Sequence, residues 1–209
     1  MRGPLGSGSP QRGLPRPLVP VSRRVVVPQR PTIAVCDLDG TLLDSDEALV
    51  APFLALGIAR AEIRFGPPVA EECARLGIAL DDYVDGYDTE AVKPFPGVEA
   101  MLAGLGRWAL CSNKHPRPGR AELARLGWSP AVALFTDAFD GPKSLGPVLA
   151  ALGVEAEEII FLGDTAHDRT CAEEVGATFA LAGWNPRASA SESDVVLEHP
   201  EDLLELLER

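Results

Sequence analysis

The 209-residue sequence contains no run of 18 apolar residues, so nothing in it predicts a membrane-spanning helix. It has four cysteines and no Cys-x-x-Cys pair, which argues against a zinc site or a dithiol redox centre. Cys36 and Cys111 each end an apolar run, where a buried free thiol is the simplest interpretation. Reduced thiols and the lack of a secretory hydrophobic region favour a cytoplasmic protein.

Lysine is rare in this chain, and acidic residues are abundant. Only Lys93, Lys114 and Lys143 are lysines among the 19 basic residues, and 31 acidic residues give a net charge of −12. The first 31 residues hold six arginines and no acid, so the rest, with 13 basic and 31 acidic side chains, has a net charge of −18. A body this acidic repels nucleic acid and anionic lipid, and we expect neither as a partner.

Proline and glycine are concentrated in residues 1–31, which predicts a flexible basic tail there. From Thr32 onward, short apolar runs alternate with helical patterns. Six runs lack two-residue alternation and are expected to be strands buried on both faces, at 33–36, 108–111, 132–135, 159–162, 178–181 and 195–197. Helices are expected at 97–105, 117–126, 145–152, 169–175 and 200–207. This alternation predicts an α/β fold, with a parallel sheet between two layers of helices.

About 70 residues separate the first two predicted strands, far more than a crossover needs. Helical patterns at 46–60, 68–76 and 80–88 fill this gap. We therefore expect a small helical cap at 45–92, inserted into a core domain formed by 32–44 and 93–209. Ligands of parallel α/β sheets bind at the carboxyl ends of the strands, where this cap is expected to lie.

The first predicted strand is followed directly by Asp37-Leu38-Asp39-Gly40-Thr41. Alternation along an extended chain places Asp37 and Asp39 on one side and Leu38 on the other. A polar turn that ends the strand would explain Gly40, but it does not require two carboxylates. We therefore interpret Asp37 and Asp39 as catalytic residues.

The stretch from Asp37 to Asp44 resembles the first motif of the haloacid dehalogenase superfamily, and the later motifs follow in the family's order over about residues 32–207. Ser112-Asn113-Lys114 resembles the second motif, whose hydroxyl holds the phosphoryl group. Lys143 stands in the place of the motif-three lysine, although Ser144 follows it where relatives usually carry proline. Gly163-Asp164-Thr165-Ala166-His167-Asp168 resembles the acidic fourth motif.

The pattern is most similar to phosphoglycolate phosphatase-like members with a C1 cap. The resemblance implies a Rossmann-like three-layer sheet of strand order 3-2-1-4-5. It also implies a Mg²⁺-dependent phosphatase that hydrolyses a small phosphomonoester through an aspartyl-phosphate. The expected partner is a small phosphorylated metabolite, and the chain is expected to act as a monomer or homodimer.

The residues support this chemistry independently. A carboxylate such as Asp37 can attack phosphorus, and a second acid, Asp39, can protonate the leaving oxygen and then deprotonate water. Together with Asp164 and Asp168 they would repel one another and a phosphate dianion, and a hard cation such as Mg²⁺ resolves this conflict. Asp37 and Asp164 are expected to be direct ligands, with the Asp39 backbone carbonyl as the resemblance implies. Asp168 is expected to act through water or to support the direct ligands without binding the cation itself.

Thr41, Ser112, Asn113 and Lys143 are the candidate phosphate-binding residues. Each has a simpler structural alternative. Lys143 could be a solvated surface lysine, and Ser112 and Asn113 could form an ordinary turn. Thr41 could cap a helix, as could Thr165. A basic patch follows the second motif and could bind a second anionic group or simply begin a solvated helix; it comprises Lys114, His115, Arg117 and Arg120.

Three other functions remain open at this point. A phosphomutase acting on a phosphosugar would use the same core but return the phosphoryl group to its substrate. A dehalogenase needs only the nucleophile, so Asp39 and the acidic 163–168 loop argue against it. A non-catalytic binding module would have no reason to keep Asp37, Asp39, Lys143 and Asp164 together.

Overall fold

The structure is a computed structural model that describes Met1 and residues 31–207. The predicted tail at 1–31 therefore lies almost entirely outside the described residues. Within them a parallel sheet forms the centre of the molecule, in the order β5-β4-β1-β6-β7-β8. Its strands are β1 (Ile33–Cys36), β4 (Trp108–Cys111), β5 (Val132–Leu134), β6 (Ile159–Gly163), β7 (Thr178–Ala182) and β8 (Val195–Leu197).

The order of the first five strands confirms the predicted 3-2-1-4-5 arrangement, and β8 extends the sheet at one edge. β1 lies in the middle because it pairs with β4 on one side and β6 on the other. All four residues of β1 are buried, as are those of β4 and β6. The central apolar runs are therefore strands whose two faces are both covered. The expectation is wrong for the strands at the sheet edges, which have a neighbour on one side only: β5 is half-buried, and Val195 and Val196 of β8 are each 40% exposed.

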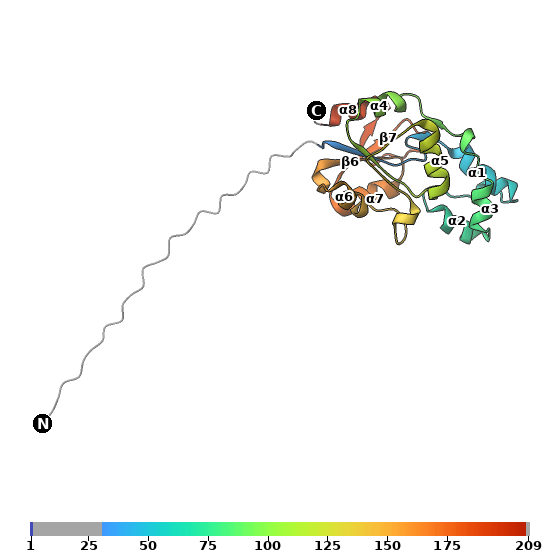
Figure 1. Cartoon of the computed structure of the whole chain (residues 1–209), viewed down its shortest axis with the longest axis horizontal. Helices are drawn as coiled ribbons and strands as arrows, with labels where there is room; N and C mark the ends of the chain where they lie inside the picture. Colours follow the sequence, from blue (N-terminus) through green and yellow to red (C-terminus); the bar gives the residue numbers. More distant parts are fainter. Residues whose placement is uncertain (2–30, 208–209) are drawn as a thin grey trace.

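Alternate residues of β1 enter two separate cores. Ala34 and Cys36 belong to the cluster that includes residues of α4, α5 and α8, whereas Ile33 and Val35 belong to the cluster of α6 and α7. Figure 1 shows the two helical layers in profile, with α4 and α8 on one side of the sheet and α6 and α7 on the other. The helices are α4 (Val98–Gly104), α5 (Pro116–Leu126), α6 (Gly146–Leu152), α7 (Ala166–Val175) and α8 (Leu203–Leu206), which follows the 3₁₀ helix η5 (Pro200–Asp202).

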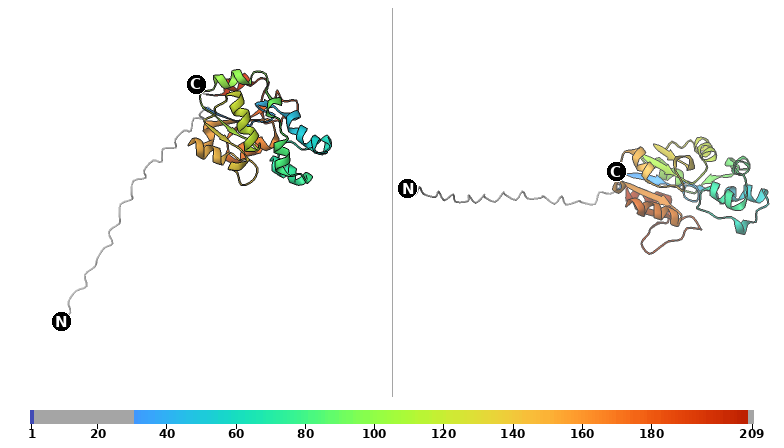
Figure 2. Two further views of the ribbon diagram at one scale, coloured as in Figure 1. Left: turned by 45° about the vertical axis from the view of Figure 1, so that its right-hand side comes forward. Right: turned by 90° about the horizontal axis from the view of Figure 1, so that it is seen from below.

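The segment between the first two sheet strands leaves and rejoins the core through a small antiparallel pair, β2 (Leu43–Asp44) and β3 (Lys93–Pro94). Between them lie α1 (Asp46–Ala55), α2 (Val69–Leu76) and α3 (Leu80–Asp85), with the 3₁₀ helices η1 (Arg60–Glu62) and η2 (Thr89–Ala91). These helices sit beyond the carboxyl ends of the sheet strands (Figure 2). This is the position expected for a helical cap.

Three helices differ in extent from the expectation by three residues or more, and one of them is α3, which ends at Asp85 rather than at residue 88. α1 ends at Ala55 rather than near residue 60, because the chain turns at Gly57 with a φ of 87° that other residues rarely adopt. α7 begins at Ala166, three residues earlier than expected, because Thr165 and Asp168 form a capping box. Two 3₁₀ segments, η3 (Thr136–Ala138) and η4 (Ala156–Glu158), complete the described structure. No helix in residues 31–207 has the length and apolarity needed to cross a membrane.

Candidate active site

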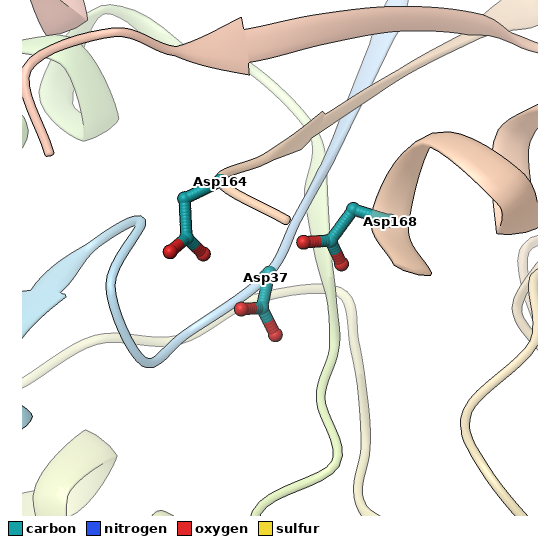
Figure 3. A group of neighbouring side chains, drawn as sticks. All are labelled: Asp37, Asp164 and Asp168. Carbon is teal, nitrogen blue, oxygen red and sulfur yellow. The ribbon is translucent and has the colours of Figure 1, made fainter. Parts of the chain in front are cut away.

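Three acidic side chains meet at the carboxyl ends of the two central strands. Asp37 follows β1, and its backbone N–H donates to the Leu162 carbonyl at 2.9 Å, continuing the pairing with β6. Asp164 follows β6, and Asp168 lies in the first turn of α7. One carboxylate oxygen from each lies within 4.8 Å of the others, and the side chains converge on a common space (Figure 3).

Lys143 supplies positive charge to this cluster. Its Nζ lies 2.5 Å from Asp37 Oδ1 and 2.7 Å from Asp168 Oδ1. The side chain is only 4% exposed, so Lys143 is not the solvated surface lysine considered above. Burial disfavours the ammonium, but Asp168 and Asp37 outweigh it and raise the pKa of Lys143 above its ordinary value.

A single lysine does not neutralise three buried carboxyl groups. Burial, reinforced by Asp168 and Asp164 and opposed by Lys143, raises the pKa of Asp37 to about 8. Burial and the charge of Asp168 raise the pKa of Asp164 to about 7, although Arg187 and Lys143 oppose the shift. Burial alone would raise the pKa of Asp168 as well, but Lys143 and hydrogen bonds from Thr165 lower it. The cluster therefore has an excess of negative charge that an additional cation would relieve.

The oxygen donors fit a hard divalent cation. Mg²⁺ prefers oxygen ligands and is usually held by one or two carboxylates together with water and substrate oxygens. Asp37 and Asp164 can provide those carboxylates. Both oxygens of Asp168 already have partners, since Oδ1 pairs with Lys143 and Oδ2 accepts from the Thr165 hydroxyl at 2.6 Å. Asp168 is thus placed to hold Lys143.

Gly40 allows the loop after β1 to pass close to Asp164. Its φ is +81°, and a Cβ at this position would lie 2.5 Å from Asp164 Oδ2 and 2.8 Å from the amide of Asn185. Asn185 Nδ2 donates to the Gly40 carbonyl and to Asp164 Oδ2, both at 2.8 Å. The loop after β7 therefore fixes the carboxylate.

The two threonines of the motifs orient the acids. Thr41 is fully buried, and its hydroxyl donates to Asp164 Oδ1 at 3.1 Å. Its carbonyl accepts from the indole N–H of Trp184 at 2.9 Å. Thr165 binds Asp168 and also caps α7, so the two functions considered for it are both present.

Ser112 and Asn113 occupy the end of β4, next to the acidic cluster. Ser112 is buried, and its hydroxyl oxygen accepts from the Lys114 N–H at 3.2 Å. The Asn113 side chain accepts from the Lys143 N–H at 2.6 Å and donates to the Gly66 carbonyl of the cap at 2.9 Å. Asn113 therefore ties the cap loop to the loop that carries Lys143.

Lys114 was considered part of a basic patch, but it is buried within the site. Its Nζ lies 2.7 Å from Asp39 Oδ1, 2.7 Å from the Tyr87 hydroxyl and 3.0 Å from Glu122 Oε1. Tyr87 comes from the cap segment and Glu122 from α5, and neither carried a recognisable signal in the sequence. Arg117 and Arg120, by contrast, form exposed pairs with Asp85 and Asp137. The patch is therefore divided between one buried cation and a solvated helix start.

A cavity opens above these residues, between the core and the cap. The core side contributes Asp37, Asp39, Ser112, Asn113, Lys143 and Asp164. The other wall comes from residues 49–87 of the cap segment. Of the predicted site residues, Asp168 and Thr41 lie behind this surface and hold the residues that line it.

The comparisons with known proteins agree with this arrangement. The sequence profile of the haloacid dehalogenase-like hydrolase family matches residues 34–182. The chain is 24% identical to the N-acetylmuramic acid 6-phosphate phosphatase of Pseudomonas aeruginosa, over 83% of this chain and 93% of the relative. It is 28% identical to a phosphoglycolate phosphatase of Xanthomonas campestris, over 84% of this chain and 96% of the relative.

Solved structures show the same fold. A haloacid dehalogenase-like hydrolase of Streptococcus pneumoniae superposes with a TM-score of 0.65 at 20% identity, over 84% of this chain and 97% of the neighbour. The L-2-haloacid dehalogenase of Xanthobacter autotrophicus superposes with a TM-score of 0.64 at 18% identity, over 84% of this chain and 98% of the neighbour. Because the family profile covers more than half of the chain and the acidic motifs meet at one site, the protein belongs to the haloacid dehalogenase-like hydrolase family.

Proposed function

We propose that this hydrolase is a Mg²⁺-dependent phosphatase that cleaves a small phosphomonoester through an aspartyl-phosphate on Asp37. The observation that carries the proposal is the meeting of Asp37, Asp164 and Asp168 around Lys143 at the carboxyl ends of β1 and β6. The names of the curated relatives, which include phosphoglycolate phosphatases and a pyrophosphatase, support phosphoryl chemistry. When bound, the cation would neutralise charge on the phosphoryl oxygens and on the carboxylates that hold it.

In the first step, a carboxylate oxygen of Asp37 attacks phosphorus, and the bond between phosphorus and the ester oxygen breaks. Lys143 lies against Asp37 Oδ1, which leaves Oδ2 to attack, and its ammonium offsets charge on the phosphoryl group. Asp39 gives its proton to the departing alkoxide, which leaves as the neutral alcohol.

In the second step, Asp39 takes a proton from a water molecule that attacks phosphorus. The bond between phosphorus and Asp37 breaks, inorganic phosphate leaves, and both carboxyl groups return to their starting states. Lys114 holds Asp39 in place for both proton transfers through the 2.7 Å contact. Ser112 lines the same cavity as Asp37, and we assign its hydroxyl to a phosphoryl oxygen of the substrate.

Phosphate release from a panel of small phosphomonoesters, with Mg²⁺ and with a chelator, tests the proposal. We expect release that the chelator abolishes and that Asp37→Asn eliminates. Asp39→Asn should slow turnover by about 10²- to 10⁴-fold, and mass spectrometry should then detect phosphate bound to the protein. Transfer of the phosphoryl group back to a sugar without release would instead show a mutase. Tight binding of an ester without turnover would show a binding module.

A further inference from the structure

The cavity has two chemically different ends. Its inner end carries the acids, Lys143 and the Ser112 hydroxyl, which suit a phosphate group and a cation. Its outer wall, formed by the cap, is mainly apolar. Six side chains make up this apolar wall: Leu49, Phe53, Ile63, Phe65, Val69 and Tyr83.

The polar groups of this wall already bind one another. The Tyr83 hydroxyl donates to the Leu49 carbonyl at 3.0 Å, and the Tyr87 hydroxyl donates to Glu122 Oε1 at 2.9 Å. Glu72 accepts from the Arg75 side chain and from the Arg64 backbone N–H. A leaving group rich in hydroxyls would lose hydrogen bonds to water on entering and gain few in return.

The cations that line the cavity outside the phosphate end are also engaged or exposed. Lys114 contacts three oxygens, and Arg187 pairs with Asp46 while its guanidinium stacks 4.1 Å from the centre of the Phe65 ring. Arg64 is exposed, where ion pairs contribute little to binding. Burial and Arg117 lower the pKa of His115, so its imidazole is neutral near pH 7. An acidic substituent under the cap would therefore lack a buried, unpaired cation among the described residues.

An apolar group fits this wall because it would displace water from aromatic and aliphatic side chains. Phe53 and Tyr83 pack with ring centres 4.5 Å apart in the cavity wall, but each is at most 3% exposed. Most of the accessible apolar surface therefore comes from the half-buried side chains of the wall, which are Leu49, Ile63, Phe65 and Val69. On these contacts, and resting on the proposed phosphatase activity, we infer that the substrate is a monoester of an aromatic or branched aliphatic alcohol, rather than a phosphosugar or a phosphorylated small acid.

Phosphate release with Mg²⁺ should be compared among esters of primary alcohols, so that leaving-group reactivity differs little. We expect kcat/KM for benzyl phosphate and 3-methylbutyl phosphate to exceed that for glycerol 1-phosphate and glucose 6-phosphate by about tenfold or more. Highest activity on 2-phosphoglycolate, lost in Arg64→Gln, would overturn the inference. Equal activity on all esters would overturn it as well.

Two variants test whether the apolar wall is the cause. Ile63→Asn places an amide in the wall and should lower kcat/KM for benzyl phosphate by about tenfold while leaving glycerol 1-phosphate nearly unaffected. Leu56→Asn, an exposed position outside the cavity, is the matched control and should change neither. Equal effects of the two variants would contradict the assignment.

A binding measurement separates this inference from the proposed activity. Benzylphosphonate and methylphosphonate, which cannot be hydrolysed, can be titrated calorimetrically into the full chain with Mg²⁺. Tighter binding of benzylphosphonate supports the apolar wall even if no ester is cleaved, in which case only the proposed function fails. Equal affinities would overturn the inference even if the protein proves to be a phosphatase.

Discussion

The Nζ atom of Lys114 lies 2.7 Å from Asp39 Oδ1, so the proposed acid/base is held by a buried lysine. The same ammonium contacts the Tyr87 hydroxyl of the cap and stands 4.6 Å from the centre of its ring. One cation therefore connects the proton-transfer group to the cap. The position of the cap above the site is expected to influence how well Asp39 is aligned.

Tyr87→Phe tests this connection, because it removes the hydroxyl and keeps the ring over Lys114. We expect kcat to fall by about tenfold from poorer alignment of Asp39, and the free energy of unfolding to fall by about 1 kcal/mol from the lost hydrogen bonds. Steady-state kinetics and thermal unfolding measure the two effects. Tyr83→Phe also removes a cap hydroxyl but does not touch Lys114, so an equal loss of kcat there would contradict the connection.

Asp37→Asn should abolish turnover, lowering kcat by about 10⁴-fold or more, because an amide cannot form the aspartyl-phosphate, an acyl phosphate. Phosphate release under saturating substrate measures the loss. Asp137→Asn serves as the control, since Asp137 is exposed, pairs with Arg120 and does not line the cavity. Comparable residual activity in the two variants would exclude Asp37 as the nucleophile.

Gly40→Ala should disrupt the site, since φ is +81° and the new Cβ would lie 2.5 Å from Asp164 Oδ2. We expect the free energy of unfolding to fall by about 2 kcal/mol or more, with loss of activity. Gly57→Ala is the matched control, because its φ is +87° but nothing lies within 4 Å of the new Cβ. For Gly57→Ala we expect the free energy of unfolding to fall by only about 1 kcal/mol, because alanine disfavours a positive φ, and we expect nearly full activity. Equal effects on activity would show that crowding at Asp164 is unimportant.

Stability in the presence of a chelator should decrease as the pH rises from about 5 to 8. The folded state raises the pKa of Asp37 from an ordinary 3.8 to about 8 and that of Asp164 to about 7. The folded state therefore holds more protons than the unfolded state in this range, and unfolding becomes more favourable as these protons are lost. The lowered pKa of Asp168 acts in the opposite direction only at more acidic pH.

Chemical unfolding at several pH values measures this slope. Asp164→Asn should make the slope shallower, and saturating Mg²⁺ should reduce it because the cation stabilises the ionised carboxylates of the cluster. The contribution of Glu122, whose pKa burial raises to about 7, should remain. Stability that is constant or increases with pH in the chelated protein would contradict the charge excess assigned to the cluster.

The sequence was sufficient to predict the sheet and the acids, because the buried strands are short uninterrupted apolar runs and the acids follow two of them directly. Parallel strands end at one edge of the sheet, so Asp37 and Asp164 had to lie close together. Lys143 was placed by its resemblance to a family motif, and the structure puts its ammonium between two of the carboxylates.

Other contacts depend on packing between distant segments. Tyr87 and Asn185 reach the site from the cap and from the loop after β7, and their sequence neighbours give no sign of the partners they meet. Lys114 resembled a solvated residue because it precedes two exposed arginines, and only the fold shows that it turns inward. The early start of α7 was signalled by Thr165 and Asp168, whose spacing fits a capping box.

Calorimetric titration of Mg²⁺ into the purified protein tests the central claim most directly, because the claim is that Asp37 and Asp164 hold a divalent cation together. We predict saturable binding of one ion per chain, lost in Asp164→Asn and kept in Asp137→Asn, with phosphate release appearing as the site fills. Full phosphatase activity without any bound divalent ion, or unchanged Mg²⁺ binding in Asp164→Asn, would contradict the account.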